Sequence, residues 1–269
     1  MVCPMTIINP RINRDFFSLA TTDLLTKDLL IDIATGVVGA VKVKRFASPE
    51  RCAMLAIVLA NAEFNAFDEV RYQVPTFNLG PIMNHYLLHG YLTEQYWKQA
   101  ETASRFWREH KDLDLRQECR DRISDVWQGP VTAARVDGHF VYWGIVRENG
   151  RGAQPHWDDV SHEFPTDFFV PRPVAQLTFN LYLRMPQDGG DTVIWPRRWR
   201  PSDEAYRAGS SWPNLPFDQK PLTVHCELGD ALVFDPRNYH SVLPGSEGRR
   251  FALGFYLGIA SDGTLVTWS

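Results

Sequence analysis

The sequence predicts an α+β fold that is mainly β: a jelly-roll type barrel with an N-terminal helical buttress. Helical spacing of apolar residues dominates before about residue 130, and short alternating runs bounded by turn residues follow Gly129-Pro130. The chain has 269 residues, 44% of them hydrophobic, which is enough for one large core. We therefore expect a single domain over 1–269, with mainly helical support in 1–130 and the β-core in 131–260.

Three helices are expected in the first half. Ser48-Pro49-Glu50 combines an N-cap residue, a first-turn proline and an early acidic residue. The apolar positions that follow at helical spacing are Met54, Leu55, Val58 and Ala62. A second helix begins at Thr93-Glu94 and a third covers 115–126, while a short strand at 41–46 precedes all three.

Alternating runs in the second half predict strands at 140–146, 175–183, 192–195, 231–234 and 251–257. Successive strand residues face opposite sides, so Thr178, Asn180 and Tyr182 are predicted to face the barrel interior. The alternate residues are expected to pack on helices: Leu177, Phe179, Leu181 and Leu183. The insertion 196–221 is long for a connection, and we expect it to be functional or partly disordered.

The composition excludes several classes of function. A formal net charge of −4 provides no basic field for a phosphate backbone, so no nucleic-acid partner is expected. No apolar run approaches the ~20 residues of a membrane span, and the first residues lack the pattern of a signal peptide. The four cysteines form no CxxC pair, which argues against a disulfide scaffold and a thiolate zinc site. A cytoplasmic protein is expected.

Two histidines and one carboxylate form the strongest candidate site. His156 and Asp158 are two residues apart, a spacing that brings both side chains to one face of a strand. The same spacing predicts that Asp159 points away. His240 follows the apolar strand at 231–234 and its turn. Two imidazoles and one carboxylate leave three positions of an octahedral ion open, the arrangement of non-haem Fe(II) oxygenases.

Four further motifs accompany these residues in order. Leu181-Tyr182-Leu183 and Gly189-Gly190-Asp191-Thr192 come first, the run 229–234 leads into the second histidine, and Gly248-Arg249-Arg250 follows it. With this order and spacing, the chain resembles the Fe(II)/2-oxoglutarate-dependent oxygenases, whose core is a double-stranded β-helix of jelly-roll or cupin-like type. It is most similar to their prolyl-hydroxylase-like branch. The helical half resembles, more faintly, the hydroxylases and halogenases of free amino acids.

The resemblance implies a role for each residue. His156, Asp158 and His240 would bind Fe(II). Arg250 would hold the distal carboxylate of 2-oxoglutarate with its planar fork of donors, and Arg249 would face the other side of the strand. Candidates for hydrogen bonds to 2-oxoglutarate are Thr178, Asn180 and Tyr182. The implied reaction uses 2-oxoglutarate and O2 to hydroxylate a C–H bond of a small polar molecule, such as an amino acid or a derivative.

Several residues are candidates for substrate binding. Arg147 stands where prolyl hydroxylases carry a tyrosine, nine residues before the first histidine, and could meet a carboxylate. The arginine cluster at 197–200 is either a solvated loop or a lid that recognises an anionic substrate. Candidates for an ammonium group are Glu148, Asp159 and Glu163. The opposing hypothesis is an apolar pocket lined by Trp143, Trp157 and Trp195.

Three other functions stay open at this point. A radical halogenase needs glycine or alanine in place of the metal-binding carboxylate, and Asp158 argues against it. A hydroxylase of protein side chains would use the insertion as a peptide clamp. A non-catalytic metal-binding β-barrel module would release no succinate.

Overall fold

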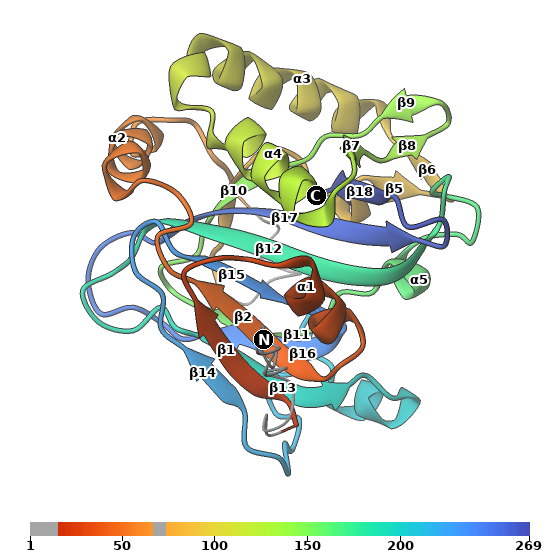
Figure 1. Ribbon diagram of the computed structural model, residues 1–269. Coiled ribbons are helices and arrows are strands. Elements are labelled where there is room, and N and C mark those ends of the chain that lie inside the picture. The colour runs from red at the N-terminus through yellow and green to blue at the C-terminus, as the bar shows by residue number, and fades with distance from the viewer. Residues whose placement is uncertain (1–15, 67–73) are drawn as a thin grey trace, which may run out of the picture.

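The computed structural model describes residues 16–66 and 74–269 (Figure 1). The expectation about the first residues lies outside these ranges, and so does Cys3, one of the four cysteines. The described chain is a mixed α/β structure in which most regular structure is sheet. No helix in these ranges is both long and apolar enough to cross a bilayer.

One ten-stranded sheet forms the main layer, with its central path in the order β1-β2-β15-β12-β17-β10-β4-β3. A further strand, β18, pairs with β17 and in turn with β7. The bounds are β1 Ser18–Thr22, β2 Val38–Val43, β3 Asn65–Ala66, β4 Phe77–Leu79, β7 Val131–Ala133, β10 Ile145–Glu148, β12 Pro173–Arg184, β15 Ala231–Phe234, β17 Phe251–Ala260 and β18 Leu265–Trp268.

A second sheet of four strands has the order β11-β16-β13-β14. Its strands are β11 Ala153–His156, β13 Thr192–Arg198, β14 Leu222–Val224 and β16 Asn238–Val242. Two small hairpins complete the strands: β5 Leu87–Leu88 with β6 Tyr91–Leu92, and β8 Arg135–Val136 with β9 His139–Phe140. Figure 1 places β13 and β14 on one side of β12, and α3 and α4 on the other.

The helices are α1 Lys27–Ala34, α2 Pro49–Leu59, α3 Glu94–Glu109, α4 Leu115–Trp127 and α5 Val160–Glu163, with short 3₁₀ turns η2 Met83–His85, η3 Lys111–Leu113 and η4 Pro201–Tyr206. The three predicted helices are therefore confirmed as α2, α3 and α4. The side chain of Ser48 accepts a hydrogen bond from the amide of Arg51, as an N-cap does. The buried face of α2 differs from the prediction, because Met54 is 54% exposed.

Several boundaries also differ from the predictions. The strand expected at 41–46 lies at 38–43 and ends before Arg45, whose φ is +46°. The first 130 residues are less helical than expected, since β1 and β2 extend the main sheet beside β15. The strand expected at 140–146 is interrupted near Gly144, which has a φ of +77°, and β10 starts at the next residue. Strand β13 continues to Arg198, so the insertion begins inside a strand.

Strand β12 lies between the main hydrophobic cluster and a cavity, and its side chains alternate between the two. Its predicted core residues are all at most 1% exposed and join the main hydrophobic cluster: Leu177, Phe179, Leu181 and Leu183. The ring of Phe179 meets Phe46 edge-on at 5.0 Å, near the start of α2. The alternate residues line a cavity on the opposite face: Thr178, Asn180 and Tyr182. The period-two prediction for this strand is confirmed, and it fixes which side chains face the cavity.

Candidate active site

Two histidines face each other across the second sheet. Antiparallel pairing of β11 with β16 sets His156 directly opposite His240, and their ring centroids are 4.2 Å apart. The Nδ1 of His156 lies 2.8 Å from the carbonyl oxygen of Gln154, and the Nδ1 of His240 lies 3.0 Å from that of Asn238. A carbonyl oxygen only accepts, so each Nδ1 carries the proton. With the proton on Nδ1, the Nε2 atom of each ring is the one that can bind a ligand.

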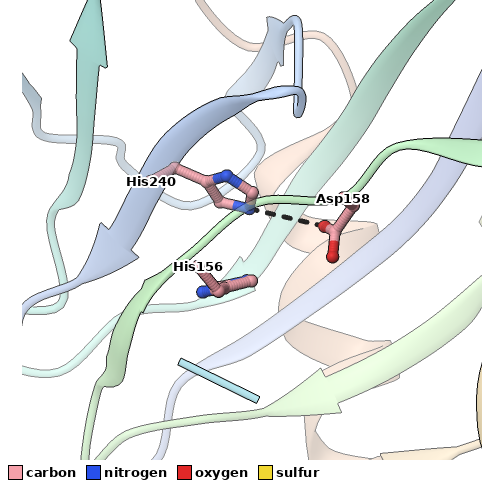
Figure 2. A group of neighbouring side chains, drawn as sticks. All are labelled: His156, Asp158 and His240. Carbon is pink, nitrogen blue, oxygen red and sulfur yellow. Dashed lines mark ion pairs between the residues drawn. The ribbon is translucent and has the colours of Figure 1, made fainter. Parts of the chain in front are cut away.

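Asp158 completes this group from just beyond the end of β11. Its amide donates to the carbonyl of Pro236 at 3.0 Å, and Tyr256 donates its hydroxyl to Oδ2 at 2.9 Å. The same Oδ2 lies 3.6 Å from Nε2 of His240, and Figure 2 shows these two side chains beside the ring of His156. One potential ligand atom from each residue lies within 4.8 Å of the others. The neighbouring Asp159 does not join this group, as the spacing predicted, and instead caps α5.

The charge state of this group suits a divalent cation. Burial raises the pKa of Asp158, but His156, His240 and Arg147 outweigh burial and hold the pKa below its usual value. Burial, together with the nearby His156, lowers the pKa of His240 to about 3. The metal-free site therefore holds a neutral imidazole at His240 beside an ionised carboxylate. This donor set fits Fe(II), which binds imidazole nitrogen and carboxylate oxygen.

Arg250 lines the same cavity and is only 3% exposed. Its guanidinium donates to the carbonyl of Gly190 at 3.0 Å and to the side chain of Asn149, and Thr192 Oγ1 lies 3.5 Å from Nη2. Arg249 points the other way and forms an ion pair with Glu148. The motif spacing therefore selected the inward-facing arginine correctly.

The cavity lies between the two sheets and has a volume of about 1060 Å³, its open mouth included. Four of the predicted residues line it beside the metal-binding group: Arg147, Thr178, Asn180 and Tyr182. The sequence did not reveal Asn84, Asn149, Thr192 or Tyr256, which line it as well. Of these, only Thr192 belonged to a recognised motif, the Gly-Gly-Asp-Thr run. Its Oγ1 lies 2.9 Å from the hydroxyl of Tyr182.

The three predicted tryptophans do not line this cavity, so the hypothesis of a tryptophan-lined apolar pocket is wrong. Trp143 packs edge-on against Phe255 at 5.4 Å, in a separate hollow beneath α3 and α4. Trp157 faces away from its neighbours in the metal-binding group, because successive residues alternate in direction. It belongs with Trp195 to an aromatic cluster that anchors the insertion: Trp157, Trp195, Trp199, Trp212, Leu215, Phe217 and Tyr239.

The arginine cluster of the insertion is used within the protein. Arg197 pairs with Asp203 at 2.6 Å, and Arg198 pairs with Asp235 at 2.7 Å. The hypothesis that this cluster forms a lid for an anionic substrate is therefore not supported. The acidic residues that were candidates for binding an ammonium group also have partners within the protein. Glu148 is paired with an arginine and Asp159 caps a helix, whereas Glu163 accepts a hydrogen bond from the side-chain amide of Asn84.

Comparison with known proteins gives a relative by sequence and similar solved structures. No family model matches the chain. The chain is 34% identical to L-gamma-glutamyl-L-propargylglycine hydroxylase of Streptantibioticus cattleyicolor over 249 residues, which are 91% of this chain and 93% of the relative. The crystal structure of an N-substituted L-amino acid dioxygenase from Burkholderia ambifaria aligns with a TM-score of 0.56. It is 15% identical and covers 91% of this chain and 92% of its own, which shows a shared fold.

The fold and the cavity define the class of protein. Two imidazoles and one carboxylate that leave one side of an ion open are typical of mononuclear non-haem iron enzymes. With the sequence relative, the assignment becomes specific: the chain belongs to the Fe(II)/2-oxoglutarate-dependent oxygenases. It is an oxidoreductase of the dioxygenase type, a hydroxylase that uses Fe(II), 2-oxoglutarate and O2.

Proposed function

We propose that this enzyme hydroxylates a C–H bond of an amino acid derivative that bears a free carboxylate. In the balanced reaction, R–H, 2-oxoglutarate and O2 give R–OH, succinate and CO2. The observation that carries the proposal is the shared cavity, where the group of His156, Asp158 and His240 lies with the buried fork of Arg250. The sequence relative is a hydroxylase of L-γ-glutamyl-L-propargylglycine, a dipeptide, which supports the substrate class.

Different residues of the cavity would bind the metal and position its ligands. His156, Asp158 and His240 would hold the iron, which when bound supplies the activation of O2 coupled to decarboxylation of 2-oxoglutarate. Tyr256 would hold the carboxylate of Asp158 in place through its hydrogen bond. This support leaves the other carboxylate oxygen of Asp158 free of a protein donor among the described residues.

At the Arg250 end, the guanidinium is already oriented by Gly190 and Asn149. A planar fork of donors matches the distal carboxylate of 2-oxoglutarate, and the hydroxyl of Thr192 beside it supplies a further donor. The ring of Tyr182 lies under this guanidinium, with 5.0 Å between the ring centroid and the guanidinium carbon. Thr178 and Asn180, next on the same strand, are proposed to contact the co-substrate closer to the metal.

The substrate is proposed to occupy the part of the cavity that Arg147 lines. No hydrogen bond or ion pair among the described residues satisfies its guanidinium, so it is available to the carboxylate of an amino acid. Arg147 and Arg250 both line this cavity, which supports the binding of an amino acid derivative beside the co-substrate.

We also propose that the two sheets form the double-stranded β-helix of this superfamily, and that the whole chain is one domain. One cavity is lined by side chains from strands of both sheets, β12 in the first and β11 and β16 in the second, which supports this proposal. The helices α1 and α2, which pack toward β12, would then stiffen the sheet that carries the co-substrate contacts.

The test begins without O2. Fe(II) and 2-oxoglutarate added to the protein should give the weak visible band of their chelate. After O2 is admitted, succinate should form in step with a product one oxygen heavier, from L-γ-glutamyl-L-propargylglycine or from another member of an amino acid panel. Chloride is included, since a chlorinated product would indicate a halogenase. Turnover restricted to protein side chains would contradict the substrate class, and the absence of both band and succinate would indicate a non-catalytic module.

A further inference from the structure

Most polar side chains that line the cavity already have partners within the protein. Tyr256 donates to Asp158, for example, and Asn149 accepts from Arg250. The other lining residues with such partners are Thr76, Asn84, Thr178, Asn180, Tyr182, Thr192 and Ser211. The guanidinium of Arg147 and the carboxamide of Gln154 differ from these, because neither forms a hydrogen bond with the described residues.

Gln154 is placed to meet a ligand next to the metal-binding group. It lies on β11 two residues before His156, a spacing that brings the two side chains to the same face of the strand. The carbonyl of the intervening Pro155 accepts the amide of Trp212 at 2.7 Å, which ties the insertion to this strand. Gln154 is partly exposed, and neither its Oε1 nor its Nε2 is sealed from solvent. Both atoms are therefore accessible to a bound molecule.

The charges around the cavity favour a substrate whose nitrogen is neutral. Among the described residues that line it, Asp158 is the single acidic one, and its carboxylate faces the metal-binding His240. Arg147 and Arg250 oppose it, so these walls carry one positive charge in excess. Fe(II) and doubly ionised 2-oxoglutarate cancel each other and leave this excess unchanged. A single substrate carboxylate would balance it, whereas an ammonium group would find no uncommitted carboxylate on these walls.

We propose that Gln154 selects substrates in which the nitrogen beside the carboxylate-bearing carbon is acylated, by forming a hydrogen bond with that amide. The proposal rests on the proposed function and narrows its substrate class. A carboxamide is neutral and carries donors and an acceptor, so it matches an amide, whereas an ammonium group binds best to a carboxylate. Arg147 on β10 and Gln154 on β11 would contact the substrate from the two different sheets.

The experiment compares three compounds that share one side chain: L-propargylglycine, N-acetyl-L-propargylglycine and L-γ-glutamyl-L-propargylglycine. The first has an ammonium group where the other two have an amide. Dissociation constants are measured without O2, from the change that each compound causes in the visible band of the Fe(II)–2-oxoglutarate chelate. The wild type should bind the N-acetyl compound at least about 10-fold more tightly than the free amino acid. If the substrate panel identifies a different side chain, that amino acid is compared in the same three forms.

Two variants separate a hydrogen bond to the amide from a general effect on the cavity. Gln154→Leu should weaken the N-acetyl compound by about 10–100-fold and the free amino acid by less than about 3-fold. Gln154→Glu keeps the shape but adds a negative charge, so the free amino acid should become the tighter ligand. The matched control is Gln117→Glu on the exposed face of α4, where Gln117 donates to Asp121. It should change neither dissociation constant, and saturation by 2-oxoglutarate should be unchanged in all three variants.

The failures of the two proposals can be told apart. If the wild type hydroxylates acylated amino acids but Gln154→Leu weakens all three compounds equally, or weakens 2-oxoglutarate, the role of Gln154 is wrong and the proposed function stands. The same conclusion follows if the wild type binds and hydroxylates the free amino acid best. If Gln154→Leu does not fold, Gln154→Glu decides, and an unchanged order of binding overturns the assignment. If the wild type hydroxylates no amino acid derivative, both proposals are overturned together.

Discussion

The two arginines that line the cavity differ in how many hydrogen bonds their guanidinium groups already form within the protein. Arg250 is only 3% exposed and donates to Gly190, Asn149 and Thr192. Arg147 is partly buried, and no described residue accepts a hydrogen bond from its guanidinium. The first arginine is held rigidly before any ligand binds, as suits a co-substrate that every turnover requires. The guanidinium of Arg147 still needs a hydrogen-bond acceptor, which a bound substrate can supply.

The sheet itself leaves room for the second arginine. Gly254 on β17 lies beside it, where a Cβ atom would come within 2.8 Å of Asn180 Oδ1 and 3.5 Å of Arg147 Nη1. The missing side chain therefore lets the guanidinium lie close to Asn180. Arg147 also acts on the metal-binding group, since it contributes to the lowered pKa of Asp158. Arg147 thus lies close to the metal-binding group.

Removing a metal ligand should disable both ends at once and give the largest effect. In His240→Ala, succinate formation should fall by at least about 100-fold, because an ion held by three groups loses one of its two imidazoles. Anaerobic Fe(II) titration, read from the 2-oxoglutarate chelate band, measures the loss directly. The variant should still unfold cooperatively, so activity retained at the wild-type level would refute the metal assignment.

Arg250→Lys should impair only the co-substrate end. Lysine keeps the charge but loses the planar fork, so the concentration of 2-oxoglutarate needed for half-maximal rate should rise by about 10–100-fold. The matched control is Arg249→Lys, one residue away on the opposite face, which should leave this concentration within about 2-fold of the wild-type value. Similar changes in the two variants would mean that charge or local folding, not the fork, was measured.

Arg147→Met should impair only the substrate end. We expect the KM for the amino acid derivative to rise by about 10–50-fold, because a charge-assisted hydrogen bond is lost on one ligand. The half-saturating concentration of 2-oxoglutarate should stay within about 3-fold, since Arg250 is intact. A substrate whose carboxylate is replaced by a carboxamide should bind wild type and variant about equally. If instead 2-oxoglutarate weakens most, Arg147 belongs to the co-substrate end and the contrast between the two arginines is lost.

The hydrogen bond that supports the metal-binding carboxylate provides a smaller test. Tyr256→Phe removes the hydroxyl that donates to Asp158, so Fe(II) affinity should fall by about 10-fold while the fold is retained. Binding of Co(II) or Ni(II) under identical conditions gives a readout independent of turnover. Unchanged metal affinity with impaired hydroxylation would show that Tyr256 contacts the substrate and does not position the carboxylate.

The smallest effect concerns stability and pH in the metal-free protein. The pKa of Glu163 is raised to about 8, first by burial and then by Asp158, so the folded state binds its proton more tightly than the unfolded state. This contribution to the free energy of unfolding is complete below pH ~4.5, the unfolded pKa, and is lost as the pH rises through about 8. Glu163→Gln should flatten that loss in denaturant titrations at pH 5 and 8.5, while the exposed control Glu94→Gln should not.

Local spacing along the chain was enough to predict several parts of the protein. The two-residue period of β12 placed Thr178 and Asn180 on the cavity face. The His-x-Asp spacing and the motif before β17 selected Asp158 over Asp159 and Arg250 over Arg249. Capping and helical periodicity located the helices that begin near Ser48 and Thr93. Each of these predictions uses a direction or a turn that is set by neighbours in the chain.

Contacts between groups that are distant in the sequence depend on the folded arrangement and could not be predicted. Asn84, Tyr256 and Glu163 reach the site region from η2, β17 and α5, and no spacing in the sequence links them. The same is true of the rejected candidates: Trp157 faces the insertion, and Arg197 is neutralised by a carboxylate that only the folded insertion brings near. Long-range pairing and burial assign these partners, because a side chain's hydrogen bonds depend on what packs against it rather than on its place in a local repeat.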